Sequence, residues 1–152
     1  MNIFWLDENI KTNASYYCDK HIVKMLLEYA QMLSTANRTC GLDEGYKIAH
    51  LNHPCTVWVR TSITNWKTLY LLAYYVQVEY YNRYGKVHKS WRVIRRLSVP
   101  NLPSKGLTTV PQCMPEEYKN EDLITAYRNY YKGEKRGIAR WNYSEEPHWW
   151  RE

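Results

Sequence analysis

Glycine and proline are scarce in this sequence, with six of each among 152 residues. Because β folds with many tight turns use glycine heavily, its scarcity favours helices. No apolar run reaches the roughly 18 residues that a membrane-spanning helix needs. Residues 1–7 lack both the basic region and the long apolar stretch of a signal peptide. We therefore expect a protein that stays in the cytoplasm and does not associate with a membrane.

The cysteines form no recognisable metal or redox motif. None of them lies in a CxxC pair, which argues against a zinc ribbon and against a dithiol redox site. His53-Pro54-Cys55 offers two metal ligands, but nothing nearby in the sequence completes a set. We therefore expect no metal ion and no other cofactor. The four cysteines are Cys18, Cys40, Cys55 and Cys113.

Length and composition indicate one globular domain. A chain of 152 residues, 45% of them hydrophobic, can bury a core without disulfide bonds. Helical periodicity of the apolar residues predicts an all-α fold in which two long helices pack together. The expected helices span 13–37, 56–83, 89–97 and 121–132. We expect Gly85 and Gly133 to end the second and the last of them. Residues 2–6 should be extended, residues 100–115 should form a loop, and the tail 134–152 should be irregular.

The charge balance favours an anionic partner. Lys and Arg number 21 against 15 Asp and Glu, which gives a formal net charge of +6. The aromatic residues comprise 15 Tyr and 7 Trp but a single Phe. Tyr and Trp suit base stacking, although a Tyr-rich core whose hydroxyls reach the surface would have the same composition. The partner we expect is DNA or a nucleotide.

A polar stripe interrupts the first expected helix, which is otherwise largely apolar. At 3.6 residues per turn, every member of the stripe falls within about 40° of Tyr17. Such a stripe faces either solvent or a cleft. In a cleft, Lys24 would act as nucleophile, Glu28 would stabilise positive charge and His21 would shuttle protons. Lys24 and Glu28 also have the spacing of a helical ion pair. The stripe consists of Tyr17, His21, Lys24, Glu28, Gln31 and Thr35.

Two segments, 86–96 and 126–136, interleave basic and aromatic residues. This pattern fits a track along a phosphate backbone, with rings that stack on bases. A solvated charged face would give the same pattern. The residues expected to hold phosphates are Arg60, Lys86, Lys89, Arg92, Arg128, Lys132 and Lys135. Those expected to stack on a base or to line its pocket are Tyr17, His53, Tyr127, Tyr131 and Trp141.

The chain resembles a family of small, uncharacterised proteins common in bacteriophages. The resemblance spans most of the chain but implies no activity. For a phage-encoded protein, the expected location is the cytoplasm of the host. The motifs that carry the resemblance are Met1-Asn2-Ile3-Phe4, Cys18-Asp19-Lys20-His21, and Val23-Lys24-Met25 with Glu28 and Gln31.

A more distant resemblance is to the phage-type pyrimidine-dimer DNA glycosylases with AP-lyase activity, called endonuclease V. Those proteins are small, basic and all-helical, with a glutamate on an early long helix. Glu28, His53-Pro54 with Trp58, and the Tyr- and Lys-rich segment 127–132 resemble their features. In that family the initiator Met is removed and the exposed amine attacks C1′ of the damaged nucleotide. Here residue 2 is the bulky Asn, so Met1 is expected to remain. The nucleophile is then the Met1 amine or Lys24.

The residues and the resemblance together predict an enzyme of the DNA glycosylase and AP-lyase type, acting on a modified or damaged base. Two alternatives stay open. An enzyme that modifies or salvages free nucleotides would use the same stripe inside a closed pocket. A non-catalytic phage protein that binds a nucleotide or a host factor, in counter-defence, would need no chemistry from Glu28.

Overall fold

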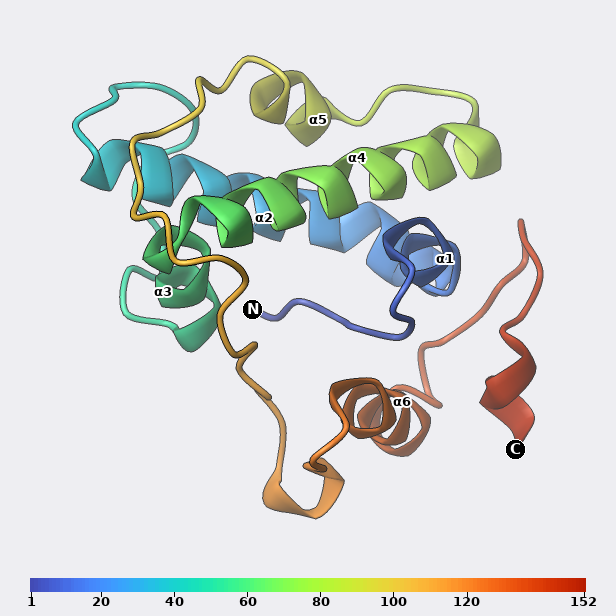
Figure 1. The fold of residues 1–152 in the computed structure, drawn as a ribbon. Coiled ribbons are helices and arrows are strands. Elements are labelled where there is room, and N and C mark those ends of the chain that lie inside the picture. The colour runs from blue at the N-terminus through green and yellow to red at the C-terminus, as the bar shows by residue number, and fades with distance from the viewer.

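The computed structural model describes residues 1–152 and consists of helices joined by loops, without a strand (Figure 1). It confirms the all-α fold that the sequence predicts. No helix combines the length and the apolar character that crossing a lipid bilayer requires. The α-helices are α1 (Ile10–Ser15), α2 (Asp19–Thr39), α3 (Pro54–Thr61), α4 (Ile63–Tyr84), α5 (Lys89–Ile94) and α6 (Leu123–Glu134). Two short 3₁₀ helices are η1 (Glu116–Tyr118) and η2 (His148–Arg151).

The two longest helices, α2 and α4, pack against each other as predicted, and α1, α3 and α5 lie against this pair (Figure 1). Their facing sides supply much of one continuous core. That core includes Met25 and Leu33 of α2 together with Leu69 and Val76 of α4, and each is at most 1% exposed. Burial of a side chain of this size contributes about 1.5–3 kcal/mol. The contact between α2 and α4 therefore fixes the frame on which the other elements assemble.

Each of the two predicted long helices is divided near one end. The predicted helix 13–37 is wrong at its start, because Cys18 is extended (ψ 159°) between α1 and α2. The predicted helix 56–83 is interrupted at Ser62 (φ −148°, ψ 145°), which ends α3 and caps α4. The Ser62 hydroxyl donates a hydrogen bond to the Gly106 carbonyl at 2.6 Å. A loop distant in sequence thus stabilises the second break.

Glycine ends α4 but not α6. Gly85 has φ 68°, a left-handed conformation that favours glycine at a helix C-terminus. The prediction that Gly133 ends the last helix is wrong, because α6 continues to Glu134. A Cβ atom at position 133 would overlap the Tyr118 ring and hydroxyl. Gly133 therefore lets Tyr118 pack closely against α6.

The N-terminal segment 2–6 is extended, as predicted, and runs between α2 and α6 (Figure 1). Phe4 stacks on His21 of α2 with ring centroids 4.6 Å apart, and it meets tyrosines of α6 edge-on. Because the segment pairs with no strand, side chains must satisfy its backbone groups. The Asn13 side chain accepts a hydrogen bond from the Leu6 N–H at 2.6 Å and donates one to the Phe4 carbonyl at 3.0 Å. These contacts hold the start of the chain against α1, α2 and α6.

Candidate active site

The start of the chain meets α2 at Glu28. The Met1 amine lies 3.2 Å from a carboxylate oxygen of Glu28, and the two side chains are 3% and 12% exposed. The Thr56 hydroxyl of α3 contacts the Met1 sulfur at 3.4 Å, which anchors the side chain. An amine and a carboxylate are therefore held together in a largely buried place.

These two groups border a hollow of about 220 Å³. His21, Lys24 and Glu28, the residues expected to be catalytic, lie on successive turns of α2 and all line it. This part of the polar stripe thus borders a hollow, and the Lys24 side chain remains exposed at its edge. His53 and Lys135 add an imidazole and an ammonium to the lining. The remaining lining residues are Met1, Asn2, Phe4, Met25, Cys113 and Tyr130.

Lys24 does not form the ion pair with Glu28 that their helical spacing predicts. The Lys24 side chain is exposed, and the ion-pair partner of Glu28 is the Met1 amine. A lysine must lose side-chain entropy to make such a pair, whereas the Met1 amine is already held by the buried N-terminal segment. Two amines therefore border the hollow, and one of them contacts the carboxylate.

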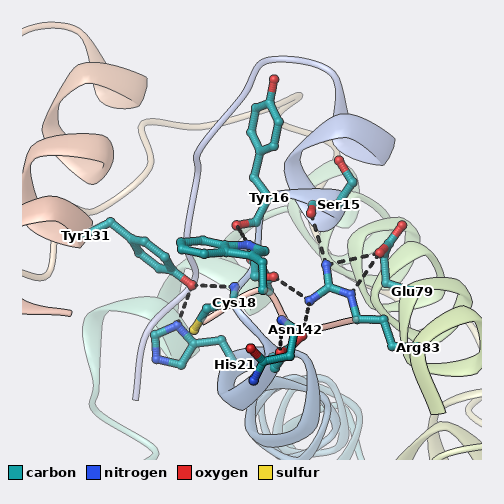
Figure 2. Close-up of polar contacts among 11 residues, drawn as sticks. Ser15, Tyr16, Cys18, His21, Glu79, Arg83, Tyr131 and Asn142 are labelled. Atoms are coloured by element: carbon teal, nitrogen blue, oxygen red, sulfur yellow. Dashed lines mark hydrogen bonds and ion pairs between the residues drawn. The ribbon is translucent and has the colours of Figure 1, made fainter. Parts of the chain in front are cut away.

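His21 is 4% exposed. Its Nδ1 lies 2.7 Å from the Tyr131 hydroxyl, which also accepts a hydrogen bond from the Cys18 N–H at 3.0 Å (Figure 2). Burial, together with the positive charges of Lys135 and Lys24, lowers the pKa of His21 to about 3. The imidazole is therefore neutral near pH 7. It does not fit the expected role of proton shuttle, which requires a group that titrates near the working pH.

Replacing His21 with Gln is expected to flatten the pH dependence of stability in acid. The folded protein holds the imidazole neutral until about pH 3, whereas the unfolded chain takes up a proton below the ordinary pKa of 6.5. The free energy of unfolding of the wild type should therefore fall as the pH is lowered through this range. This residue should contribute up to about 1.4 kcal/mol per pH unit.

Urea denaturation of both proteins at several pH values between 7 and about 4 measures this effect. Carboxyl groups titrate in both proteins, so the difference between their slopes isolates His21. Parallel slopes would contradict the low pKa of His21.

A buried ionic network lies where α1, α2 and α4 meet (Figure 2). The Arg83 side chain is 1% exposed, and its guanidinium pairs with Asp19 at 3.2 Å and with Glu79 at 3.1 Å. It also donates hydrogen bonds to the Tyr17 carbonyl at 2.7 Å and to the Ser15 carbonyl at 3.0 Å. These carbonyls lie at the end of α1, where a helix leaves its own acceptors without partners. Arg83 thereby positions the start of α2. Sequence reasoning missed it, because a lone arginine near a helix end is usually exposed.

The C-terminal tail is fastened to the same place. Asp19 accepts a hydrogen bond from the Asn142 N–H at 2.7 Å and donates its own N–H to the Arg140 carbonyl at 2.8 Å. The Trp141 indole donates to the Tyr16 carbonyl at 3.1 Å (Figure 2). Trp141, expected to stack on a base, is half-buried and instead helps to hold the tail against α1 and α2.

Three tyrosines expected to stack on a base lie in the core. Tyr17, Tyr127 and Tyr131 are each 0% exposed. The Tyr17 hydroxyl donates to the Phe4 carbonyl at 2.8 Å, and the Tyr127 hydroxyl donates to the Asn2 side chain at 3.0 Å. Stacking needs an exposed ring face, so this expectation is wrong for all three. The spacing that gives Tyr127 and Tyr131 a common face is correct, but that face turns inward to the N-terminal segment.

Two of the expected phosphate ligands are engaged within the protein. Arg128 donates to the Leu6 carbonyl at 2.8 Å and pairs with Asp7 at 3.3 Å. Arg60 donates to the Leu51 carbonyl at 2.7 Å. Both guanidinium groups therefore stabilise neighbouring backbone, which the linear pattern of cations does not reveal.

The side chains of the other expected phosphate ligands form no hydrogen bond or ion pair within the protein. Lys135 lines the hollow at Met1, and its ammonium lies 4.9 Å from the centre of the Tyr130 ring. Lys89 and Arg92 border a second hollow of about 480 Å³ on α5. Lys132 is half-buried. The exposed residues of this group are Lys86, Lys89 and Arg92.

Two cysteines distant in sequence meet beside the hollow. The sulfur atoms of Cys55 and Cys113 lie 3.6 Å apart. One potential ligand atom from each of them and one from His53 lie within 4.8 Å of one another. Nothing near His53 and Cys55 in the sequence offers a further ligand, but the fold brings Cys113 beside them from the predicted loop 100–115. The hydrogen bond with Cys55 lowers the pKa of the Cys113 thiol to about 7.

Comparison of the chain with models of protein families, with curated proteins and with solved structures found no match. The resemblances seen in its motifs stay predictions, and the function is inferred from the site.

Proposed function

We propose that this protein is a DNA-acting enzyme of the glycosylase and AP-lyase type, with the Met1 amine as nucleophile. The observation that carries the proposal is the contact of 3.2 Å between that amine and Glu28 at the rim of a hollow. An amine that forms an imine must reach the substrate and must give up a proton. Met1 borders the hollow, and Glu28 is placed to take the proton. Lys24 is the second amine at the same hollow.

The chemistry follows from these two groups. Glu28 takes a proton from the Met1 ammonium, and the nitrogen lone pair then attacks C1′ of the nucleotide. The glycosidic bond breaks with its electron pair on the base, which takes the proton back from Glu28. A second N–H proton moves to the ring oxygen as the C1′–O4′ bond opens, leaving a protonated imine beside the Glu28 carboxylate. The Glu28 carboxylate then takes a C2′ proton, a C2′–C3′ double bond forms, and the C3′–O bond breaks with its electron pair on the departing 3′ phosphate, which is the lyase step.

The size of the hollow favours DNA over a free nucleotide as the substrate. Pockets that enclose small ligands usually measure about 300–1,000 Å³, whereas this hollow measures about 220 Å³. It suits one sugar of a larger molecule that remains mostly outside. Lys24 and Lys135 line the hollow and supply two positive charges, which favour binding of the phosphates that flank a nucleotide in DNA.

Borohydride trapping is the experiment that tests the proposal. We expect DNA with an abasic site, mixed with the protein and borohydride, to give a covalent adduct, because hydride reduces the imine at C1′ to a stable amine. Proteolysis and mass spectrometry should locate the adduct on the Met1 nitrogen. One residue added before Met1 should abolish trapping, since it displaces the amine from Glu28. Replacement of Lys24 by Met removes the second amine and should still give the Met1 adduct, at a rate lowered by the loss of one phosphate contact.

Different results would lead to other conclusions. An adduct on Lys24 would keep the reaction class but reassign the nucleophile. No adduct with abasic DNA or with a panel of lesion-bearing duplexes would contradict the proposal. Turnover of free nucleotides without an adduct would instead favour a salvage or base-modifying enzyme.

A further inference from the structure

The cluster of His53, Cys55 and Cys113 takes no part in the chemistry proposed above. His53 precedes α3 and Cys55 lies in its first turn, whereas Cys113 belongs to the segment that leads to η1. His53 and Cys113 line the hollow at Met1, and Cys55 is buried behind them. Thiolate and imidazole are the ligands that zinc prefers, and magnesium and calcium take oxygen ligands instead.

The distance between the two sulfur atoms fits a shared metal ion better than a bond between them. Two thiolates bound to one tetrahedral zinc, each at the usual Zn–S length, lie about 3.8 Å apart. A disulfide would bring them to about 2.05 Å. The observed separation of 3.6 Å is close to the first value. A zinc ion therefore fits between the thiols with little movement of either chain segment.

The loop that carries Cys113 is held by a second set of contacts. The Asn2 side chain donates to the Cys113 carbonyl at 2.9 Å, and the Cys113 N–H donates to the Tyr127 hydroxyl at 3.4 Å. The Tyr127 hydroxyl also lies 2.9 Å from the Pro111 carbonyl, so the Asn2 oxygen and this carbonyl share its single proton. Groups that hold metal ligands in place by hydrogen bonds commonly raise the affinity of the site for the metal. The third ligand is thus brought to α3 by several hydrogen bonds of its own backbone.

We propose that His53, Cys55 and Cys113 bind one Zn²⁺ ion whose fourth coordination position opens toward the hollow at Met1. Three protein ligands with an open fourth position are the arrangement of zinc sites that take a water molecule or a substrate atom. The Nδ1 atom of His53 now accepts a hydrogen bond from the Cys55 N–H at 3.1 Å. His53 gives up this hydrogen bond if Nδ1 binds the metal. The site joins the start of α3 to the loop before η1, and it does not depend on imine chemistry at Met1.

The test uses the full-length reduced protein, freed of metal and titrated with Zn²⁺ against a chromophoric chelator, and with Co²⁺ as a spectroscopic probe. We expect about one metal ion per chain and a thiolate-to-cobalt charge-transfer band with tetrahedral d–d bands. Replacing Cys113 with Ser should weaken zinc binding more than about 100-fold, beyond the usual effect of a supporting contact. Replacing His53 with Asn should do the same, while Asn keeps a helix-capping oxygen for α3.

Cys40→Ser is the matched control, because Cys40 is an exposed thiol outside the cluster. It should bind zinc as the wild type does, and circular dichroism should show that all variants remain helical. Zinc affinity that is unchanged in Cys113→Ser would overturn the proposal, as would absence of a thiolate-to-cobalt band. Ready formation of a Cys55–Cys113 disulfide by a protein that binds no zinc when reduced would overturn it too. Borohydride trapping in the presence of a chelator reports on Met1 alone, so the two proposals fail separately.

Discussion

Replacing Glu28 with Gln is expected to lower the rate of base release and strand cleavage about 100-fold or more. Gln keeps the shape of the side chain and accepts a hydrogen bond from the Met1 amine, but it cannot take the proton from that amine. It also cannot stabilise the cationic sugar and the protonated imine. Loss of a group that stabilises charge in a transition state typically costs on the order of 3 kcal/mol in barrier. Single-turnover rates on the DNA that gives the borohydride adduct measure this effect.

The stability of this variant should change much less than its rate. A hydrogen bond to a charged group contributes about 1.5–3 kcal/mol, and Gln retains part of it. Glu116→Gln is the matched control, since this carboxylate is 86% exposed and pairs with Lys119 at the surface. The control should keep the wild-type rate. Wild-type turnover by Glu28→Gln would show that Glu28 has no chemical role. An unfolded Glu28→Gln protein would show that the pair with Met1 is a requirement of the fold.

Replacing Arg83 with Met is expected to give the largest loss of stability among the changes considered, about 3–5 kcal/mol. Met keeps the apolar stem but removes every donor of the guanidinium. The Asp19 carboxylate, 11% exposed, would lose its partner. The carbonyls of Ser15 and Tyr17 would lose their donors as well. An uncompensated buried charge costs far more than a lost surface pair, and urea denaturation measures the difference.

Two comparisons make this expectation specific. Arg151→Met removes an exposed pair with Glu146 and should change the free energy of unfolding by about 1 kcal/mol or less. Adding Asp19→Asn to Arg83→Met removes the unpaired charge and should restore part of the stability. A loss below about 1 kcal/mol for Arg83→Met would mean that water reaches the network and solvates Asp19 in the folded protein. If the double variant is no more stable than Arg83→Met, the loss of stability comes from the carbonyl groups that have lost their donors.

The sequence by itself determined the helical class and the pairing of the two long helices. Both depend on local periodicity, because apolar residues at helical spacing must face a partner whatever that partner is. The same periodicity brought His21, Lys24 and Glu28 onto one stripe, and all three line one hollow. Gly85 was predictable as the end of α4, because only the local backbone conformation is at stake. The interruption at Ser62 was not predictable, because its hydrogen-bond partner Gly106 is distant in sequence.

Only the tertiary structure decided which groups meet at the site. Helical spacing pairs Glu28 with Lys24, but the buried N-terminal segment places the Met1 amine beside the Glu28 carboxylate instead. Spacing also gives Tyr127 and Tyr131 a common face without saying that Phe4 and Asn2 cover it. Likewise, no local pattern joins Cys113 to His53 and Cys55. Contacts between distant segments depend on how the segments pack, so a single sequence determines which residues are polar or apolar on each helix and leaves their partners to the assembled core.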